Sequence, residues 1–127
     1  MSEPAEKGVL IEVSAGEFID RHLINSLRIK KLKTPADLPW IKEQTAQAAL
    51  LLQKLAAHSD LIERLEEIHA ILWDLEDQVR SAPGADLASL ARQIFAMNDE
   101  RHTIKSAIDQ ALPTRCAAGR IYSNQAR

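Results

Sequence analysis

The chain of 127 residues is 46% hydrophobic and 27% charged, with a formal net charge of -2, which is typical of one globular domain. This charge and an aromatic content of 4% argue against a nucleic-acid partner, which would need a basic surface and stacking rings. A single cysteine, Cys116, and the lack of a leader-like start or a membrane-length apolar run favour a cytoplasmic protein without a membrane span.

The two ends of the chain are expected to lie outside the folded domain. Residues 1–8 are predicted to be disordered and residues 114–127 to form a flexible tail, which leaves a helical domain at 9–113. The stretch "VLIEV" at 9–13 is rich in β-branched residues, so one short N-terminal strand is an additional expectation. A lone strand needs a partner, either the tail "GRIYS" at 119–123 or a second copy of the chain.

The first helix is predicted from Ser14 to about Lys33, just before Pro35. Ser14 and Glu17 form the pattern S-x-x-E, in which each side chain satisfies a free backbone N–H at the helix start. Apolar residues fall on two faces of this helix. That pattern is expected of a helix in the centre of a bundle or in an oligomer.

Two of the three later helices have clear boundary signals. The second is predicted from Asp37, its N-cap, to about Ala57, and the fourth from its cap Asp86 to Pro113. Short connections between helices of this length favour antiparallel neighbours. The sequence therefore predicts an all-α fold, namely an antiparallel four-helix bundle. A helical hairpin that dimerises into a bundle is the alternative.

The third helix, which begins after Ser59 or Asp60, carries the clearest periodic pattern. Its apolar residues recur every three or four positions, which is the spacing of a heptad seam. The fourth helix continues that spacing. The residues of the seam in the third helix are Leu61, Leu65, Ile68, Leu72, Leu75 and Val79.

The polar run at 98–102 interrupts the fourth helix. At about 100° per residue, Arg101 lies in the middle of the apolar stripe, Asn98 and Lys105 lie at its edge, and Asp99–Glu100 points away. An inward guanidinium needs a carboxylate or phosphate partner, because an unpaired buried charge costs several kcal/mol. The sequence therefore predicts that Arg101 faces the bundle interior and is paired there.

Two interpretations of this inward arginine remain open. In the structural one, Arg101 forms a buried ion pair with Glu76, Glu17 or Asp20 and fixes the register of the helices. In the functional one, arginine and lysine side chains line a pocket for an anion, because arginine suits bidentate binding of carboxylate or phosphate. The candidate ligand-binding residues are Asp20, Arg21, Arg28, Glu76, Asn98, Arg101 and Lys105.

Trp73 in the third helix falls about 120° from the heptad seam. It is therefore expected either to pack on another helix or to be exposed for a protein partner. Arg80 lies three residues after Asp77, a spacing typical of a surface ion pair. Trp73 and Arg80 are the candidate partner-binding residues.

Metal, cofactor and nucleophile signals are weak. Glu66 with His69, and Asp99 with His102, have the E-x-x-H and D-x-x-H spacing of di-iron bundles, but these acids point away from the apolar seams. No metal, no cofactor and no complete catalytic constellation is expected. Cys116 has no matched histidine, so a catalytic thiol is not expected either. Enzyme activity is therefore less favoured than binding.

Three stretches resemble a bacterial family catalogued as domain of unknown function 6165. "IEVSAGEFIDRHLINSLRIKKL" is similar to the family's opening, "LWDLEDQVR" to its "LW-x-IED-x-IR", and "LARQIFAMNDERHTIKSAI" to its "NDER" block. The resemblance spans residues 9–112 and implies a shared helical fold without a known activity. It also implies a link to the synthesis of cell-surface polysaccharide. The motif positions are Gly16, Glu17, Asp20, Arg21, Arg28, Trp73, Glu76, Asp77, Arg80, Asn98, Asp99, Glu100, Arg101 and Lys105.

Three functions are carried forward from the sequence. The first is a noncatalytic helical module that binds a protein partner, which predicts an exposed apolar patch. The second is a structural homodimer, which predicts balanced charges around Arg101. The third is a site for a small anion such as a carboxylate or a sugar phosphate, either for binding or for catalysis. It predicts a pocket beside Arg101 in which cations outnumber carboxylates.

Overall fold

The computed structural model describes residues 6–35, 37–81 and 86–116, and the helices of these ranges confirm the predicted all-α bundle. No helix of the described ranges is long and apolar enough to cross a membrane. The elements within these ranges are α1 (Ala15–Leu32), α2 (Pro39–Lys54), a short 3-10 helix η1 (Ala56–His58), α3 (Ser59–Ser81) and α4 (Leu87–Ala111).

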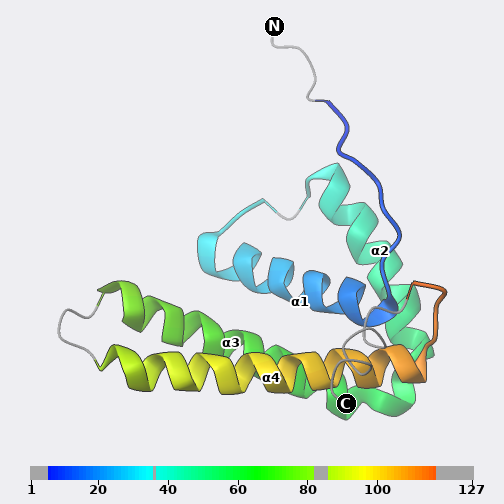
Figure 1. The fold of residues 1–127 in the computed structure, drawn as a ribbon. Coiled ribbons are helices and arrows are strands. Elements are labelled where there is room, and N and C mark those ends of the chain that lie inside the picture. Colours follow the sequence, from blue (N-terminus) through cyan, green and yellow to red (C-terminus); the bar gives the residue numbers. More distant parts are fainter. Residues whose placement is uncertain (1–5, 36, 82–85, 117–127) are drawn as a thin grey trace, which may run out of the picture.

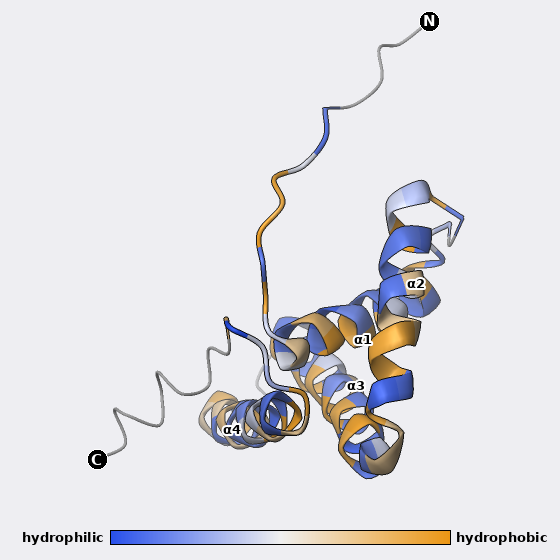
Figure 2. Ribbon diagram, turned by 90° about the vertical axis from the view of Figure 1, so that its right-hand side faces the viewer, coloured by the Kyte–Doolittle hydropathy of each residue, from blue (hydrophilic) through white to orange (hydrophobic). Residues whose placement is uncertain are grey.

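Helices α1, α3 and α4 pack against one another and form the body of the bundle (Figure 1). The two long helices α3 and α4 lie side by side as an antiparallel hairpin, and α1 lies along one side of both. Helix α2 packs mainly against α1, and its first turns stand away from the hairpin, as Figure 2 shows. The face of α1 that is turned away from the hairpin is therefore the one that α2 covers in part.

The ends of α1 are the ones that the sequence predicts, but only the Ser14 half of the expected capping box forms, because the Glu17 carboxylate accepts from Arg21 and Lys105 instead. The Ser14 hydroxyl accepts a hydrogen bond from the backbone N–H of Glu17 at 3.2 Å, which satisfies a free donor at the helix start. At the other end, Lys33 adopts a left-handed conformation with φ of 52°, and its N–H donates to the carbonyl of Ile29. This is the common helix stop, in which a left-handed residue lets the backbone close the last turn.

The start of α2 differs from the prediction. Asp37 was expected to cap this helix, but α2 begins at Pro39, and Leu38 is the N-cap without a side-chain hydrogen bond. Proline is favoured in the first turn because its missing N–H would have no partner there anyway. The helix also ends earlier than residue 57, because η1 forms the tight connection to α3.

The hydrophobic core lies between α1, α3 and α4 and includes Leu55 after α2. The heptad seam of α3 supplies most of its side of the core, as predicted. Val79 is the exception, with 42% of its surface exposed, because the far end of the hairpin extends past the part that α1 covers. The buried apolar residues of the core cluster are Ala15, Ile19, Leu23, Leu55, Leu65, Ile68, Leu72, Ile104 and Ile108.

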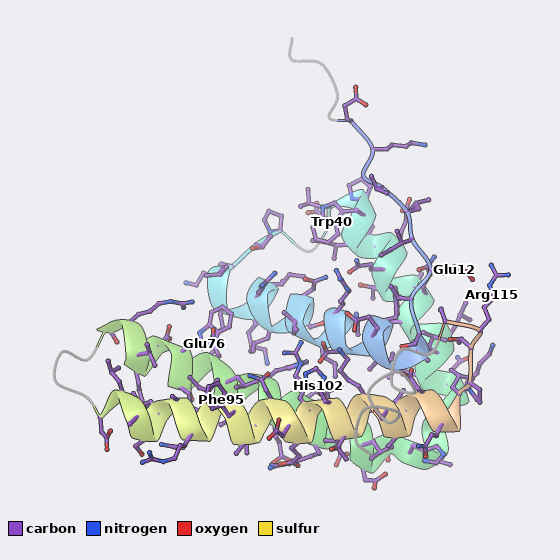
Figure 3. The ribbon with its side chains drawn as sticks, viewed as in Figure 1. Glu12, Trp40, Glu76, Phe95, His102 and Arg115 are labelled. Atoms are coloured by element: carbon purple, nitrogen blue, oxygen red, sulfur yellow. The ribbon has the colours of Figure 1, made fainter. Side chains whose placement is uncertain are left out.

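The expected strand at 9–13 does not form. These residues are extended coil, and Val9, Leu10 and Ile11 are 92%, 96% and 73% exposed. The described ranges contain no strand that could serve as a partner, and the alternative partner segment 119–123 lies outside them. Glu12 is nevertheless held near the end of α4, because Arg115 donates to its carboxylate at 2.9 Å (Figure 3).

Candidate functional site

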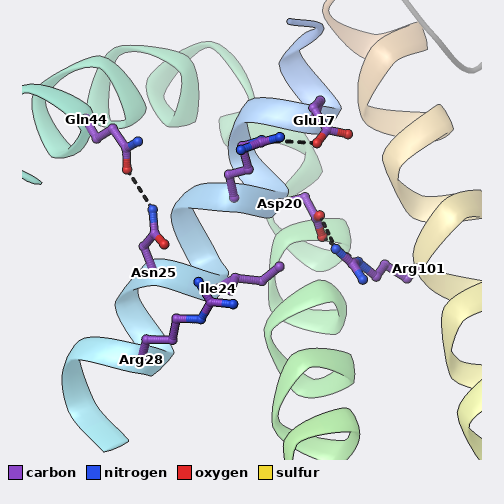
Figure 4. Close-up of a pocket in the computed structure, with 8 residues that line it drawn as sticks. Glu17, Asp20, Ile24, Asn25, Arg28, Gln44 and Arg101 are labelled. Atoms are coloured by element: carbon purple, nitrogen blue, oxygen red, sulfur yellow. Dashed lines mark hydrogen bonds and ion pairs between the residues drawn. The ribbon is translucent and has the colours of Figure 1, made fainter. Parts of the chain in front are cut away.

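Asp20 is the centre of the polar cluster and comes from the buried face of α1, with 1% of its surface exposed. Arg101 of α4 donates to both of its carboxylate oxygens, from Nε to Oδ1 at 2.9 Å and from Nη2 to Oδ2 at 2.6 Å (Figure 4). This two-point contact is the geometry in which an arginine and a carboxylate bind most specifically. The prediction that Arg101 points inward and is paired is confirmed.

His69 of α3 is a third member of the cluster. Its Nε2 lies 2.7 Å from Asp20 Oδ1, and the side chain is almost fully buried. An ionised carboxylate only accepts hydrogen bonds, so Nε2 is the donor in this contact. Nδ1 is buried and has no hydrogen-bond partner among the described residues. The E-x-x-H spacing of Glu66 and His69 indicated only a metal ligand, so this role of His69 was not predicted.

The ionisation of Asp20 is strongly favoured by its partners. Burial by itself would raise the pKa of Asp20, but hydrogen bonds from His69 and Arg101 and the charges of Arg101 and Lys105 outweigh it. The pKa of Asp20 is therefore held well below its usual range. The carboxylate of α1 is thus a fixed negative charge to which groups on α3 and α4 are bound.

Glu17 extends the cluster by one turn of α1. Lys105 Nζ donates to Glu17 Oε2 at 2.7 Å and lies 3.5 Å from Asp20 Oδ2, so one lysine bridges two acids. Arg21 Nε donates to Glu17 Oε1 at 3.2 Å. The hydrogen bond from Lys105 is the largest influence on Glu17 and holds its pKa below the usual value, despite partial burial.

A close approach of two helices fixes the position of this cluster. Asp109 of α4 accepts a hydrogen bond from the backbone N–H of Gly16 at 2.7 Å, in a buried position at the start of α1. A Cβ atom at Gly16 would collide with the carbonyl oxygen of Lys105. Only glycine lets α1 approach α4 so closely. Asp109 lies outside the three motifs of the family resemblance, so this contact could not be predicted from them.

A pocket of about 240 Å³ opens beside Arg101, between α1, α2 and α4 (Figure 4). Three of its lining side chains are arginines and two are carboxylates. Arg28 forms no hydrogen bond or ion pair with any residue in the described ranges, and Arg21 uses its Nε for Glu17. The lining residues are Glu17, Asp20, Arg21, Ile24, Asn25, Arg28, Gln44 and Arg101.

Most of the predicted ligand-binding residues meet at this pocket or beside it. Asn98 accepts a hydrogen bond from Arg101 Nη1 at 3.3 Å and so steadies the guanidinium. Glu76 is the residue that does not join them. It is exposed and lies 3.8 Å from Arg80. Of the three partners considered for Arg101, Asp20 is therefore the one that binds it and Glu76 is not, and Arg80 pairs with Glu76 and not with Asp77.

Glu100 corrects a second expectation. It was predicted to be solvated, but Arg64 of α3 donates to both of its carboxylate oxygens, at 2.5 and 2.8 Å. The pair therefore joins the two helices of the hairpin directly.

The two tryptophans differ in exposure. Trp73, a candidate contact for a partner, is partly exposed, which leaves both of its interpretations open, whereas Trp40 at the start of α2 is 51% exposed. The described ranges hold no group of three or more histidine, cysteine or acidic residues that could bind a metal ion. The exposure of Trp40 could not be predicted from the sequence, because Trp40 falls within the broad apolar face of its helix, where burial is expected.

No protein-family model, curated protein or solved structure matches the chain. The similarity to domain of unknown function 6165 therefore stays a prediction from the motifs.

Proposed function

We propose that the protein binds a small anionic metabolite, carrying a carboxylate or a phosphate, in the pocket beside Arg101. The observation that supports this most is the surplus of arginine at the pocket, with Arg28 unpaired among the described residues. Arg101 and Lys105 are matched by the acids Asp20 and Glu17. Arg21 shares Glu17 with Lys105, and the Arg28 guanidinium has no acidic partner among the described residues, so both can meet the negative charge of a ligand.

The members of the site have different tasks in this proposal. Arg101 is held at three of its nitrogens by Asp20 and Asn98, so its side chain forms a fixed side of the pocket. Arg28 and the outer nitrogens of Arg21 make the direct contacts, because a guanidinium fork matches carboxylate and phosphate oxygens. Ile24 adds an apolar surface to the lining of the pocket. The hydrogen bond of 2.8 Å between Asn25 and Gln44 joins α1 to α2 at the side of the pocket that α2 forms.

The size of the pocket limits the class of ligand. About 240 Å³ is at or below the lower end of the volumes typical of small-molecule sites. A ligand of a few carbon atoms with one or two anionic groups fits this volume better than a nucleotide does. Because the family that the chain resembles is linked to surface polysaccharide, sugar phosphates come first among the compounds to test, followed by small dicarboxylates. The proposal is for binding and assigns no catalytic residue.

The test is a thermal-shift titration, followed by calorimetry, of wild type and two arginine variants. A ligand at about 100 times its Kd stabilises the folded state by ~2.7 kcal/mol, which raises Tm by several degrees. Arg28→Gln should weaken binding by about tenfold or more, because hydrogen bonds to charged groups contribute ~1.5–3 kcal/mol. Its Tm without ligand should stay at the wild-type value, since Arg28 has no partner to lose.

The matched control is Arg92→Gln, which removes an exposed arginine of α4 that has no partner in the described ranges and lies outside the pocket. It should bind like wild type. If no sugar phosphate or dicarboxylate shifts the Tm of wild type, or if Arg28→Gln responds as strongly as wild type, the pocket is not an anion site.

A second candidate, association through residues 9–13, is favoured by the exposure of Val9, Leu10 and Ile11. An extended apolar segment with free backbone groups can add a strand to a protein partner or to a second copy. We take the second copy as the version to test. Light scattering over a range of concentrations should then show dimers for wild type and for Leu50→Asp, an exposed leucine of α2, but monomers for Leu10→Asp. If the wild-type protein stays monomeric at every concentration, association through residues 9–13 is excluded.

A further inference from the structure

The corner between α1 and α2 exposes apolar side chains that the core does not use. Leu32 at the end of α1 is 63% exposed, and Leu38 and Trp40 at the start of α2 are 37% and 51% exposed. Figure 3 shows Trp40 at the end of α2 that stands away from α3 and α4. These side chains are therefore not covered by another described element of the chain.

The same corner concentrates positive charge. Five of the sixteen lysine and arginine residues, but only one of the eighteen acids, lie between residues 28 and 42. Lys30, Lys31 and Lys33 are exposed, and their ammonium groups have no hydrogen bond or ion pair with any described residue. In a chain with a net charge of -2, this is a marked local excess of positive charge.

We propose that this corner, formed by Lys30, Lys31, Leu32, Lys33, Leu38 and Trp40, binds the surface of a membrane that contains anionic phospholipids. The indole of tryptophan and the side chains of leucine are stabilised in the interface between headgroups and acyl chains. Lysines next to them are attracted to the phosphates of anionic lipids. A bilayer surface provides both environments within a few ångströms of each other.

Charge and composition favour a bilayer over a soluble polyanion. A nucleic acid or an acidic protein would satisfy the lysines, but it would leave Leu32, Leu38 and Trp40 in water or require a matching apolar patch. The contact is peripheral, because no described helix could span a membrane. It is also independent of the proposed anion pocket, because none of the six residues of the corner lines that pocket.

The first measurement is sedimentation of the full chain with vesicles of phosphatidylcholine alone and vesicles of phosphatidylcholine mixed with phosphatidylglycerol. Binding is expected only with phosphatidylglycerol and should weaken as salt is added. A lysine near an anionic surface contributes ~1 kcal/mol, or about fivefold in affinity. The triple variant Lys30→Gln, Lys31→Gln, Lys33→Gln should therefore bind about 100-fold more weakly. The control Lys54→Gln, an exposed lysine at the other end of α2, should bind like wild type.

The second measurement uses the fact that the chain has two tryptophans. In Trp73→Phe, all tryptophan fluorescence comes from Trp40, and its emission should shift to shorter wavelength when vesicles with phosphatidylglycerol are added. In Trp40→Phe, the partly buried Trp73 should show no such shift. Circular dichroism of each variant verifies that the helices are intact.

Three results would overturn the proposal. The first is a lack of sedimentation with phosphatidylglycerol vesicles. The second is vesicle binding that the triple lysine variant keeps in full. The third is lysine-dependent binding of duplex DNA or polyglutamate without any binding of vesicles, which would identify the corner as a site for a soluble polyanion. A failure of the anion pocket would leave all of these measurements unaffected.

Discussion

The free energy needed to desolvate a buried arginine and a buried aspartate can exceed the free energy gained from their interaction. The surroundings of Asp20 and Arg101 therefore decide whether the pair stabilises the fold. Here the pair has excellent geometry and further partners. Asp20 is also bound by His69 and lies near Lys105, and Arg101 is bound by Asn98. Every polar atom of the pair that faces the interior is therefore satisfied, which favours a fixed helix register.

The losses from removing the two members of this pair are expected to be non-additive, because each single variant leaves the charge of the other member buried. Arg101→Met leaves the Asp20 charge buried without its main partner and should lower the free energy of unfolding by ~3 kcal/mol. Asp20→Asn leaves the Arg101 guanidinium without its ionised partner and should lower the free energy of unfolding by a similar amount. The double variant should cost at least ~1 kcal/mol less than the sum of the two. Urea denaturation of the four proteins measures this coupling, and strictly additive losses would show that the contact does not stabilise the fold.

Periodicity explains how much of this cluster could be predicted. The angle of Arg101 around its own helix is set by the spacing of Ile94, Met97 and Ile104, so its inward direction could be predicted from the sequence. Its partner could not, because a helical angle does not tell which residue of which helix lies opposite. For that reason Asp20 was one of three candidates, and the role of His69 was missed.

At the scale of elements, the contact between α1 and α4 depends on Gly16. Gly16→Ala places a methyl group against the Lys105 carbonyl and near Asp109, and overpacking of this kind costs ~1–3 kcal/mol. This loss should exceed the gain in helix propensity, which is at most ~1 kcal/mol. The free energy of unfolding should therefore fall by ~1–2 kcal/mol in denaturant melts.

Gly8 offers the matched control, since a Cβ there would meet nothing within 4 Å. Gly8→Ala should leave the denaturation midpoint unchanged. Equal midpoints for Gly16→Ala and wild type would mean that α1 can move away from α4 without loss. The position of the Asp20 cluster would then not depend on this contact.

Helix ends and helix faces were predictable to different degrees. The caps Ser14 and Asp86 could be predicted because each acts on its own first turn. Whether residues 9–13 form a strand, and which residue pairs with Glu100, depend on contacts with distant segments of the chain. A strand requires a neighbouring strand edge, and an ion pair requires a cation on the adjacent helix. Neither requirement can be evaluated from the neighbouring residues in the sequence.

At the scale of the whole molecule, the body of the bundle and the corner at α2 use charge in opposite ways. In the body, acids and bases are paired between α1 and α4 and between α3 and α4, which fixes the three helices in one register. At the corner, lysines are left unpaired among exposed apolar side chains. The paired charges of the body thus lie apart from the lysines of the corner, whose ammonium groups have no partner among the described residues.

The internal pairing also sets how stability depends on pH. The pKa values of Asp20 and Glu17 are both lowered in the folded state, from ordinary values of 3.8 and 4.5. The unfolded chain therefore takes up these protons first as the pH falls, and the free energy of unfolding decreases with it. Burial lowers the pKa of His22 despite the charge of Glu66. The unfolded chain therefore takes up this proton first, and the free energy of unfolding already begins to decrease below about pH 6.5.

The prediction is a steep loss of stability below about pH 4.5 that Asp20→Asn makes shallower. Removing one such group reduces the slope by up to ~1.4 kcal/mol per pH unit, because one proton fewer separates the unfolded from the folded state. Urea melts at a series of pH values measure this slope for both proteins. Arg92→Gln changes a surface charge without removing an acid and should keep the wild-type slope. An equal acid slope in Asp20→Asn and wild type would mean that Asp20 is not held ionised by Arg101 and His69, because a carboxylate with an ordinary pKa contributes no such dependence.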